Sequence, residues 1–283
     1  MVKTKKMIVL IILLIFILLV LWLVWSNKTL AVTKITVTSD KLPQSFSGFR
    51  IAQVSDLHNA EFGKDNQTLI KKLKNTNPDI IVITGDFADC RNTDFEICLN
   101  FAKQALKIAP VYYVTGNHEE RIDEYDELKD GLKKEGVFVL ENESVLIERN
   151  GEQIALLGVF DPSFGDGYNL HGAAYVMENV LESLKISDEF YNVLLSHRPE
   201  LFKVYADFGI DLVFCGHAHG GQVRIPFIGG ILAPGQGFFP KYDSGIYKMG
   251  STDMIVSRGI GNSIVPVRIN NRPEIVVAEL KCE

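Results

Sequence analysis

The chain has 283 residues, of which 47% are hydrophobic and 23% are charged, and its formal net charge is −6. This composition is that of a globular protein and excludes an intrinsically disordered chain. The negative net charge argues against non-specific nucleic-acid binding, which needs a basic surface, so no nucleic-acid partner is expected.

A long apolar run lies near the start of the sequence. Residues 7–25 carry no charge and consist mainly of Leu, Ile and Val, which predicts a helix long enough to cross a membrane. Lys3, Lys5 and Lys6 precede the run, so we expect a single-pass protein of the cell membrane with a cytoplasmic amino terminus and the rest of the chain outside. A cleaved signal peptide is the alternative, but such peptides usually have a shorter apolar core that ends in small residues.

The rest of the chain alternates strand-like and helix-like segments. Strands are expected at residues 32–38, 49–55, 80–84, 111–115, 137–140, 145–149, 153–160, 192–196, 212–215, 244–249, 253–257 and 275–280. Helices are expected at residues 66–75, 93–108, 120–134, 173–184 and 200–208. The alternation predicts an α/β fold, and the hairpin-rich middle and tail predict mixed sheets. We expect a membrane anchor in residues 1–26, a short tether and edge strand in residues 27–45, and one domain in residues 46–283.

Five of the six histidines follow strand-like runs, each within a cluster of metal-binding residue types. The clusters are Asp56-Leu57-His58, Gly85-Asp86, Gly116-Asn117-His118-Glu119, His197 and Gly216-His217-Ala218-His219. Because the carboxyl ends of parallel strands meet at one rim of a sheet, we expect these side chains to converge. Taken alone, the segment around Asp86 favours a turn residue or a helix cap after a core strand over a metal ligand.

The converging side chains offer carboxylate oxygens and imidazole nitrogens but no thiolate. Such a set suits Mn²⁺, Fe or Zn²⁺ and is too rich in nitrogen for Ca²⁺. The four cysteines show no CxxC spacing, which argues against a cysteine zinc site, and Cys215 is expected to be a buried free thiol. In the Asp-x-His and His-x-His pairs, residues two apart on an extended segment would point the same way. The glycines before Asp86, Asn117 and His217 permit tight turns and close backbone approach.

In their order, these clusters resemble the sequence blocks of the calcineurin-like metallophosphoesterase superfamily. The blocks are Asp56-x-His58, Gly85-Asp86-x-x-Asp89, Gly116-Asn117-His118-Glu119, His197 and Gly216-His217-x-His219, and they span residues 50–222. The segments around His197 and after His219 look most like the bacterial membrane-associated branch. The resemblance implies a metallophosphatase-type β-sandwich of mixed sheets flanked by helices, preceded here by one transmembrane helix.

The resemblance also implies two divalent metal ions (Mn, Zn or Fe) and a role for each matching residue. One ion would be held by Asp56, His58 and His219, the other by Asn117, His197 and His217, and Asp86 would bridge both. His118 would act as general acid toward the leaving group, and Asp89 would orient His118. Two cations about 3.5–4 Å apart can lower the pKa of a shared water, so attack by a metal-activated hydroxide is expected.

Some residues near these blocks keep alternative interpretations. The arginine and glycine that usually follow the second block are replaced by Cys90 and Arg91, so no phosphate contact is assigned to Arg91. Arg198 would clamp a phosphate oxygen or form a structural ion pair. His171 matches no block and is interpreted as a loop residue, with a substrate contact as the alternative. Pairing of Cys90 with Cys98 depends on the redox compartment.

The expected activity is hydrolysis of a phosphodiester, pyrophosphate or phosphomonoester bond by a membrane-anchored enzyme. Membrane placement favours a lipid or envelope-type substrate, with a soluble ester as the alternative. The apolar, glycine-rich segment 223–240 would either cover the core or form an apolar lip that contacts an acyl chain or the membrane. A non-catalytic, membrane-tethered interaction module on the same fold is the competing function.

Overall fold

The computed structural model describes residues 2–165, 169–262 and 267–283. Met1, at the tip of the predicted anchor, and three residues of the polar stretch before His171 lie outside these ranges. The helices are α1 (Val2–Lys28), α2 (Gln67–Lys74), α3 (Phe95–Ala105), α4 (Tyr125–Glu135), α5 (Leu170–Leu184) and α6 (Phe202–Asp207).

The strands comprise those expected from the sequence and four short additional ones. They are β1 (Ala31–Ser39), β2 (Arg50–Val54), β3 (Ile80–Thr84), β4 (Val111–Val114), β5 (Phe138–Val139), β6 (Glu143–Arg149), β7 (Glu152–Gly158), β8 (Asn192–Leu195), β9 (Leu212–Cys215), β10 (Arg224–Ile225), β11 (Gly229–Gly230), β12 (Leu232–Ala233), β13 (Gly237–Phe238), β14 (Gly245–Met249), β15 (Thr252–Val256) and β16 (Glu274–Cys282).

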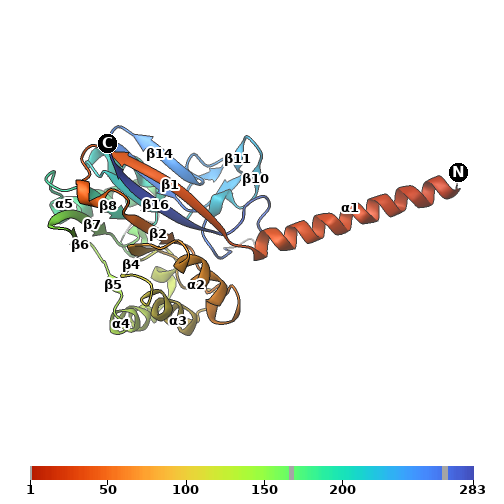
Figure 1. Cartoon of the computed structure of the whole chain (residues 1–283), viewed down its shortest axis with the longest axis horizontal. Helices are drawn as coiled ribbons and strands as arrows, with labels where there is room; N and C mark the ends of the chain where they lie inside the picture. Colours follow the sequence, from red (N-terminus) through yellow and green to blue (C-terminus); the bar gives the residue numbers. More distant parts are fainter. Residues whose placement is uncertain (1, 166–168, 263–266) are drawn as a thin grey trace.

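Two six-stranded sheets form the body of the domain (Figure 1). The first has the order β1-β16-β2-β3-β4-β5, and the second has the order β14-β15-β9-β8-β7-β6. Strands β2 to β5 are parallel, as are β7, β8, β9 and β15, whereas β16 runs antiparallel to β2 and β6 antiparallel to β7. The prediction of mixed sheets is therefore confirmed.

The sheets pack face to face with helices on both outer sides. Ile51 and Val82 of the first sheet share the inner core with Val193 and Phe214 of the second. Helices α2, α3 and α4 cover the outer face of the first sheet, and α5 and α6 cover that of the second. Strand β3 is buried along its whole length because it lies between two parallel neighbours and has apolar layers on both faces.

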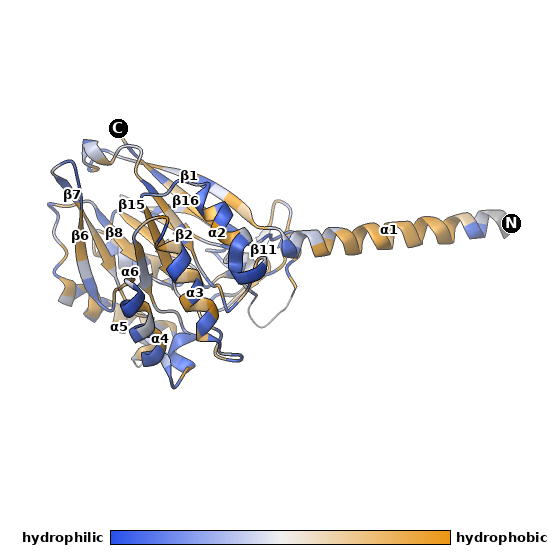
Figure 2. Cartoon of the chain, turned by 60° about the horizontal axis from the view of Figure 1, so that its bottom comes forward, coloured by the Kyte–Doolittle hydropathy of each residue, from blue (hydrophilic) through white to orange (hydrophobic). Residues whose placement is uncertain are grey.

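Helix α1 projects from the domain and is apolar along most of its length (Figures 1 and 2). Residues 4–28 qualify by length and composition as a candidate membrane span, and none of the most apolar part of that span is buried in the protein, whereas Ser26 near its end is buried. The helix continues to Lys28, so only Thr29 and Leu30 separate it from β1. This junction is shorter than the extended tether expected from the sequence.

Side chains from the carboxyl-terminal part of the chain hold this junction. The Arg272 guanidinium lies 4.6 Å from the centre of the Trp25 ring, and its Nε and Nη2 donate to Thr29 and to the Leu30 carbonyl. Asn27 brackets the backbone of Arg268: its Oδ1 accepts from the Arg268 N–H at 2.7 Å, and its Nδ2 donates to the Arg268 carbonyl at 2.8 Å. Helix α1 is thus bonded to the domain on two sides.

The segment between β9 and β14 forms two small hairpins, β10-β11 and β12-β13. Of its large apolar side chains, Phe227, Ile228, Phe238 and Phe239 are exposed, whereas the small side chain of Ala233 is buried. The first expectation for residues 223–240, that they cover the core, is therefore wrong for these large side chains. They belong to or adjoin the two small hairpins, whose strands are not part of either six-stranded sheet.

Candidate metal centre

The predicted site residues converge where strands of both sheets end. Asp56 and His58 follow β2, Asp86 and Asp89 follow β3, and Asn117 and His118 follow β4 in the first sheet. His197 follows β8, and His217 and His219 follow β9, in the second sheet. All nine residues are buried. The site therefore lies across the ends of two packed sheets rather than along the rim of one.

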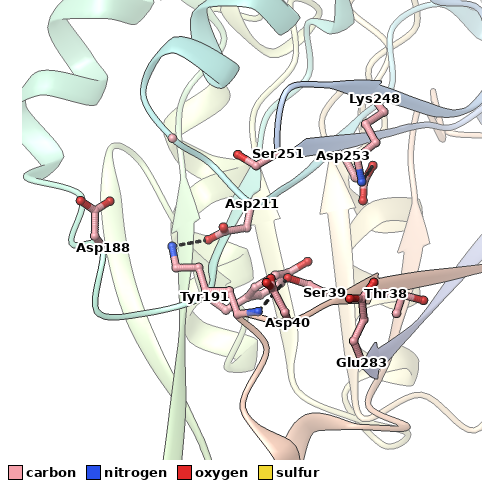
Figure 3. A pocket seen from close by; sticks show the side chains of 12 residues that line it. Thr38, Ser39, Asp40, Asp188, Tyr191, Asp211, Lys248, Ser251, Asp253 and Glu283 are labelled. Carbon is pink, nitrogen blue, oxygen red and sulfur yellow. Dashed lines mark hydrogen bonds and ion pairs between the residues drawn. The ribbon is translucent and has the colours of Figure 1, made fainter.

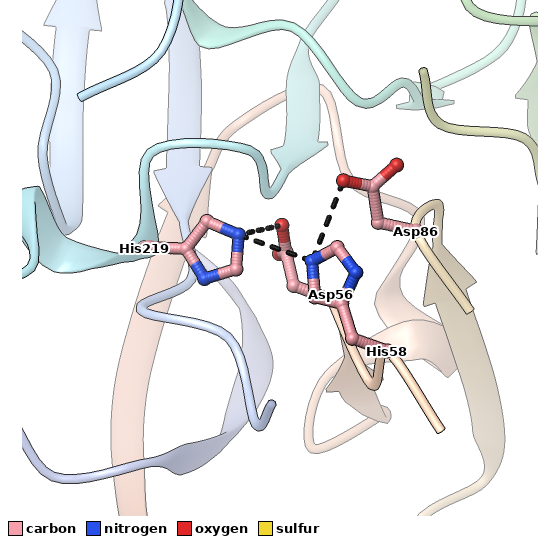
Figure 4. A group of neighbouring side chains, drawn as sticks. All are labelled: Asp56, His58, Asp86 and His219. Carbon is pink, nitrogen blue, oxygen red and sulfur yellow. Dashed lines mark hydrogen bonds and ion pairs between the residues drawn. The ribbon is translucent and has the colours of Figure 1, made fainter. Parts of the chain in front are cut away.

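Four of these side chains form a first cluster, shown in Figure 4. Nε2 of His58 lies 3.2 Å from Nε2 of His219 and 3.5 Å from Oδ2 of Asp86. Nε2 of His219 lies 3.2 Å from Oδ1 of Asp56. Two imidazole nitrogens and two carboxylates therefore direct their electron-donating atoms at one small volume.

A second cluster shares Asp86 with the first. Nε2 of His197 lies 3.4 Å from Oδ2 of Asp86 and 3.2 Å from Nδ1 of His217. Asn117 is also buried, and its Oδ1 has no hydrogen-bond partner among the described residues. A buried, unpartnered carbonyl oxygen is costly unless another group binds it, which fits a metal ligand at this position.

The protonation of the imidazoles also fits cation binding. Burial lowers the pKa of His58 to about 4 and lowers the pKa of His217 and His219 well below the usual value. Neutral imidazole is the form that binds metal ions. For His197, burial opposes charging, but Asp86 outweighs it and raises the pKa to about 10. A cation at this cluster would take the place of the proton between His197 and Asp86.

Hydrogen bonds orient the rings of the second cluster. Nδ1 of His197 lies 2.8 Å from the Thr84 carbonyl, an acceptor, so Nδ1 carries the proton and Nε2 faces Asp86. Nε2 of His217 lies 3.4 Å from Nη1 of Arg198 and 3.9 Å from the Glu200 carboxylate, while its Nδ1 faces His197. A contact such as that of His197 with the Thr84 carbonyl fixes the tautomer of a metal-binding histidine.

Five of the predicted ligands have left-handed backbone conformations. Positive φ angles occur at Asp56 (52°), His58 (46°), Asp86 (49°), His217 (65°) and His219 (47°). The Asp-x-His and His-x-His pairs are therefore tight turns, and the expectation of extended segments is wrong. Left-handed backbone is unfavourable for residues with a Cβ and concentrates at functional sites, where surrounding contacts stabilise it.

Glycines let these turns pack against one another. A Cβ on Gly116 would lie 2.3 Å from Oδ1 of Asp86, and one on Gly216 would lie 1.9 Å from Oγ of Ser55 and 2.4 Å from Oδ2 of Asp56. Any side chain at either position would displace a carboxylate of the site. The close approach expected at these glycines is confirmed.

Comparison with known families gives the same result as the site. Residues 49–221 match the family model of the calcineurin-like phosphoesterases. The chain belongs to this family. It is a metal-dependent phosphoesterase with the fold expected from its sequence.

Relatives with curated names extend over most of the chain. The chain is 30% identical to the uncharacterized metallophosphoesterase YkuE of Bacillus subtilis, over 89% of this chain and 86% of the relative. It is 28% identical to the phosphodiesterase YaeI of Escherichia coli, over 82% of each chain. A Bos taurus protein named as a transmembrane protein with a metallophosphoesterase domain is 30% identical, over 87% of this chain and 56% of the relative. Among solved structures, TT1561 of Thermus thermophilus has the same fold, with a TM-score of 0.51 and 14% identity over 76% of this chain and 91% of that chain.

In this phosphoesterase, Glu119 connects two loops of the site through backbone hydrogen bonds. Its carboxylate accepts from the N–H groups of Asp86, Phe87, Ala88 and Gly116 at 2.6–3.0 Å. Glu119 therefore supports the turns of the site. The carboxylate fixes the loop after β3 relative to the loop after β4.

His118 lies beside both clusters and has two partners at Nδ1. Oδ1 of Asp89 is 3.5 Å from Nδ1, and the backbone N–H of Cys90 is 3.3 Å from the same atom. Arg91 forms a bidentate ion pair with Asp89 at 2.6 and 2.9 Å. Nε2 of His118 lies 4.0 Å from Oδ2 of Asp86, on the side of the metal clusters. Burial lowers the pKa of His118, against the opposing charges of Asp86 and Asp89.

The mouth of the phosphoesterase site is a hollow of about 370 Å³ with arginines around it. Arg91, Arg121 and Arg198 line it together with Pro234 and Gly235 of the β12-β13 hairpin. Arg91 and Arg198 are paired there with the carboxylates of Asp89 and Asp161, and Arg121 adds a third guanidinium group at the pocket mouth.

Arg198 is largely committed to an ion pair. Its Nε and Nη2 donate to the two carboxylate oxygens of Asp161 at 2.6 and 2.9 Å, and its Nη1 lies 3.4 Å from Nε2 of His217. The ion-pair alternative is therefore present, and a substrate contact through Nη1 stays a prediction. Asp161 was overlooked in the sequence, although it follows the β7 run just as the other clusters follow their strands.

Two features of the tail were not foreseen from the sequence. Arg268 is fully buried, donates to the carbonyls of Arg258 and Gly261, and places Nη2 3.3 Å from Nδ1 of His219. Asn271 is also fully buried and donates to the His219 carbonyl at 2.7 Å. No local pattern marks their contacts with His219, which lies 49 residues before Arg268 and 52 residues before Asn271.

The remaining histidine and the cysteines lie outside the clusters. His171 is exposed at the start of α5 rather than in a loop. All four cysteines are free, so Cys90 and Cys98 do not pair, and Cys215 is buried as expected.

A second, larger hollow of about 510 Å³ lies at the opposite end of the strands (Figure 3). Residues that precede β8, β9 and β15 line it with the end of β1, and Lys41 pairs there with Asp211 at 2.8 Å. It contains no histidine and lies away from the carboxyl ends of the parallel strands, so it is not the candidate site.

Proposed function

We propose that the chain is a membrane-anchored phosphoesterase that uses two divalent metal ions at the two clusters. The observation that carries this proposal is the position of Asp86, whose Oδ2 faces buried imidazoles of both clusters at 3.4–3.5 Å. A single carboxylate between two sets of ligands fits a bridging ligand. The alternative of a non-catalytic module has less support, since every predicted ligand is present and buried.

We assign the ligands according to the cluster in which each residue lies. The first ion would be held by Asp56, His58, His219 and Asp86, and the second by Asp86, Asn117, His197 and His217. Two divalent cations bound at such a site would act as Lewis acids: they would neutralise phosphate charge and lower the pKa of a bound water. The nitrogen and oxygen ligands are compatible with Mn, Zn or Fe.

The remaining residues act on the substrate itself. His118 is placed to donate a proton from Nε2 to the leaving oxygen, with Asp89 stabilising its charged form through Nδ1. Arg91, Arg121 and Arg198 attract the phosphoester to the pocket mouth. Such a site suits a phosphodiester, pyrophosphate or phosphomonoester.

Membrane placement is the second part of the proposal. Residues 1–26 would form the anchor, 27–45 the junction and edge strand, and 46–283 the catalytic domain, on the outer side of the cell membrane. The lysines before α1 support this orientation because positive residues stay in the cytoplasm. A domain held at the bilayer favours a lipid or envelope-type substrate over a soluble ester.

Hydrolysis and metal content, measured together on the full chain in detergent, test the site assignment. We expect the protein to bind two equivalents of Mn²⁺ and to hydrolyse aryl phosphodiesters or monoesters. Asp86→Asn and His118→Asn should each lower kcat by about 10²-fold or more, as expected for loss of a bridging ligand or a general acid. Only Asp86→Asn should also reduce the bound metal.

His171→Asn serves as the matched control, because His171 is exposed and outside the clusters. It should leave both kcat and metal content unchanged. Full activity in both site variants would refute the assignment, and a single equivalent of metal in the wild type would refute the bridging role of Asp86.

A further inference from the structure

The exposed apolar side chains of the domain gather in one region. Fifteen large apolar residues outside α1 are exposed in the described part of the chain, and eight of them lie in the two hairpins or the adjoining tail. We call these eight the hairpin patch: Ile225, Phe227, Ile228, Leu232, Phe238, Phe239, Val267 and Ile269. A concentrated apolar surface of this kind usually marks a site that contacts another apolar surface.

The aromatic residues of the patch contribute little to the packing of the domain. Phe227 is fully exposed, and Phe238 and Phe239 are 74% and 64% exposed. Phe227 and Phe239 also have left-handed backbone with φ of 67° and 54°, which is unfavourable for bulky residues. These exposed rings gain little from packing against the described residues, so the cost of their backbone conformation is not offset within the domain. An apolar contact outside the domain would offset it.

The hairpin patch adjoins the point where α1 leaves the domain. Val223 forms a parallel bridge with Ile269, and the Arg224 N–H donates to the Ile269 carbonyl at 3.0 Å. The preceding residue, Arg268, is the one bracketed by Asn27 at the end of α1. In Figures 1 and 2 the β10-β11 hairpin lies on the side of the domain from which α1 emerges.

The end of α1 shows where the membrane surface would lie. Trp22 and Trp25 are exposed near that end, and tryptophans of membrane helices sit at the interface between lipid and water. Helix α1 continues for three residues past Trp25, and the junction after Lys28 is only two residues long and bonded to Arg272, so the domain is held close to this level. A surface next to the junction therefore faces the headgroups.

We propose that the hairpin patch is a second membrane contact, inserted into the interface of the same bilayer that α1 crosses. The inference rests on the proposed membrane anchoring but not on catalysis. Lys241, exposed beside Phe239 and Pro240, would lie among the headgroups. Because Pro234 and Gly235 of the same hairpins line the pocket mouth, this contact would open the site toward the lipid surface.

Tryptophan fluorescence of the full chain in vesicles tests the contact, since the chain has only two tryptophans. Phe227→Trp and Phe238→Trp are each made in a Trp22→Phe/Trp25→Phe background and reconstituted into vesicles of phosphatidylcholine and phosphatidylglycerol. Side chains in the interface lie about 5–10 Å deep, within reach of bromine on the acyl chains, so brominated phosphatidylcholine should lower their emission about twofold. Phe138→Trp in the same background is the matched control, because Phe138 is 49% exposed on β5, away from α1 (Figure 1).

The outcomes separate this inference from the rest. Quenching of both patch variants with no quenching of Phe138→Trp supports it. If lipid quenches the native Trp22 and Trp25 but neither patch variant, the second contact is refuted while the anchor stands. Protection from aqueous iodide without lipid quenching would show that protein covers the patch and would also refute it. If no tryptophan is quenched in the wild type or in any variant, both the anchor and the patch contact are refuted. This result would not bear on the proposed hydrolytic activity.

Discussion

At the scale of single residues, Glu119 stabilises the centre without facing either metal cluster. Four backbone N–H groups donate to the two carboxylate oxygens of Glu119. A glutamine would replace one of these acceptor oxygens with an NH₂ group, which can only donate. Glu119→Gln should therefore lower the free energy of unfolding by about 2–4 kcal/mol, since buried donors would lose their acceptor. Urea unfolding of the detergent-solubilised chain measures this loss, and metal analysis should show weaker binding.

Glu127→Gln is the control for that experiment, because it is the same substitution at an exposed position of α4. Its stability should stay within about 0.5 kcal/mol of the wild type. Equal stability of Glu119→Gln and the wild type would show that the loop after β3 does not depend on this carboxylate.

How far the sequence reveals the site depends on how local each signal is. Asp86 and His197 could be placed because each follows a recognisable apolar strand, and strand ends of this fold meet. Arg268 could not be placed, because its partners lie in loops that only the folded chain brings near it. The positions of the site residues were foreseen from the sequence, whereas their outer hydrogen bonds were not.

At the scale of secondary-structure elements, the metal centre depends on close packing between the loop after β3 and the loop after β4. In Gly116→Ala the new Cβ would lie 2.3 Å from Oδ1 and 2.4 Å from N of Asp86, so the loop after β3 must move. We expect this variant to lose bound metal and at least about 10²-fold in kcat, since shifts of about 1 Å at a site have such effects. Metal analysis and steady-state kinetics are the measurements.

Gly165→Ala is the matched control, because a Cβ there meets Val176 at 3.4 Å, an ordinary contact. Its activity and metal content should match those of the wild type. Wild-type metal content in Gly116→Ala would mean that the two loops can separate without loss of the site.

The elements themselves were predicted well wherever an apolar run was long. Strands such as β3 and β9 appear where the runs predicted them, because burial of branched residues determines their conformation. The turns of Asp56-x-His58 and His217-x-His219 were predicted as extended and are left-handed. Contacts with neighbouring loops outweigh the local preference there, and a single sequence contains no trace of those contacts.

At the scale of the whole molecule, the buried imidazoles make the metal-free protein sensitive to acid. The folded-state pKa values of His58, His217 and His219 lie below the unfolded value of about 6.5, so the unfolded chain binds more protons than the folded one below that pH. The stability that these three imidazoles contribute is therefore fully present above pH 6.5 and is lost as pH falls toward 4. Burial raises the pKa of Asp56 to about 6 and that of Glu119 to about 7, so these two carboxyls bind protons in the folded state and partly offset the loss. His197, whose folded-state pKa is about 10, contributes stability below pH 6.5 that is lost as pH rises toward 10.

Urea unfolding of the chelator-treated protein at pH 7 and pH 5 measures this effect. We expect a lower free energy of unfolding at pH 5, and a smaller difference between the two pH values in the variant His58→Asn. Metal-loaded protein should unfold at higher urea than chelator-treated protein at pH 7, because ligands that bind the folded state stabilise it. A metal-free protein that is more stable at pH 5 would contradict the expected neutral state of the imidazoles.

The short junction between α1 and β1 has a consequence for substrate choice. Two residues separate helix and strand, and both are bonded to Arg272. If α1 crosses a membrane as proposed, the catalytic rim would be held at one distance from the bilayer. The enzyme would then diffuse in the plane of the membrane with its catalytic site at a constant height above the bilayer. Among phosphoesters of equal chemical reactivity, it would hydrolyse those displayed at that height and pass over those that lie deeper in the membrane or further from it.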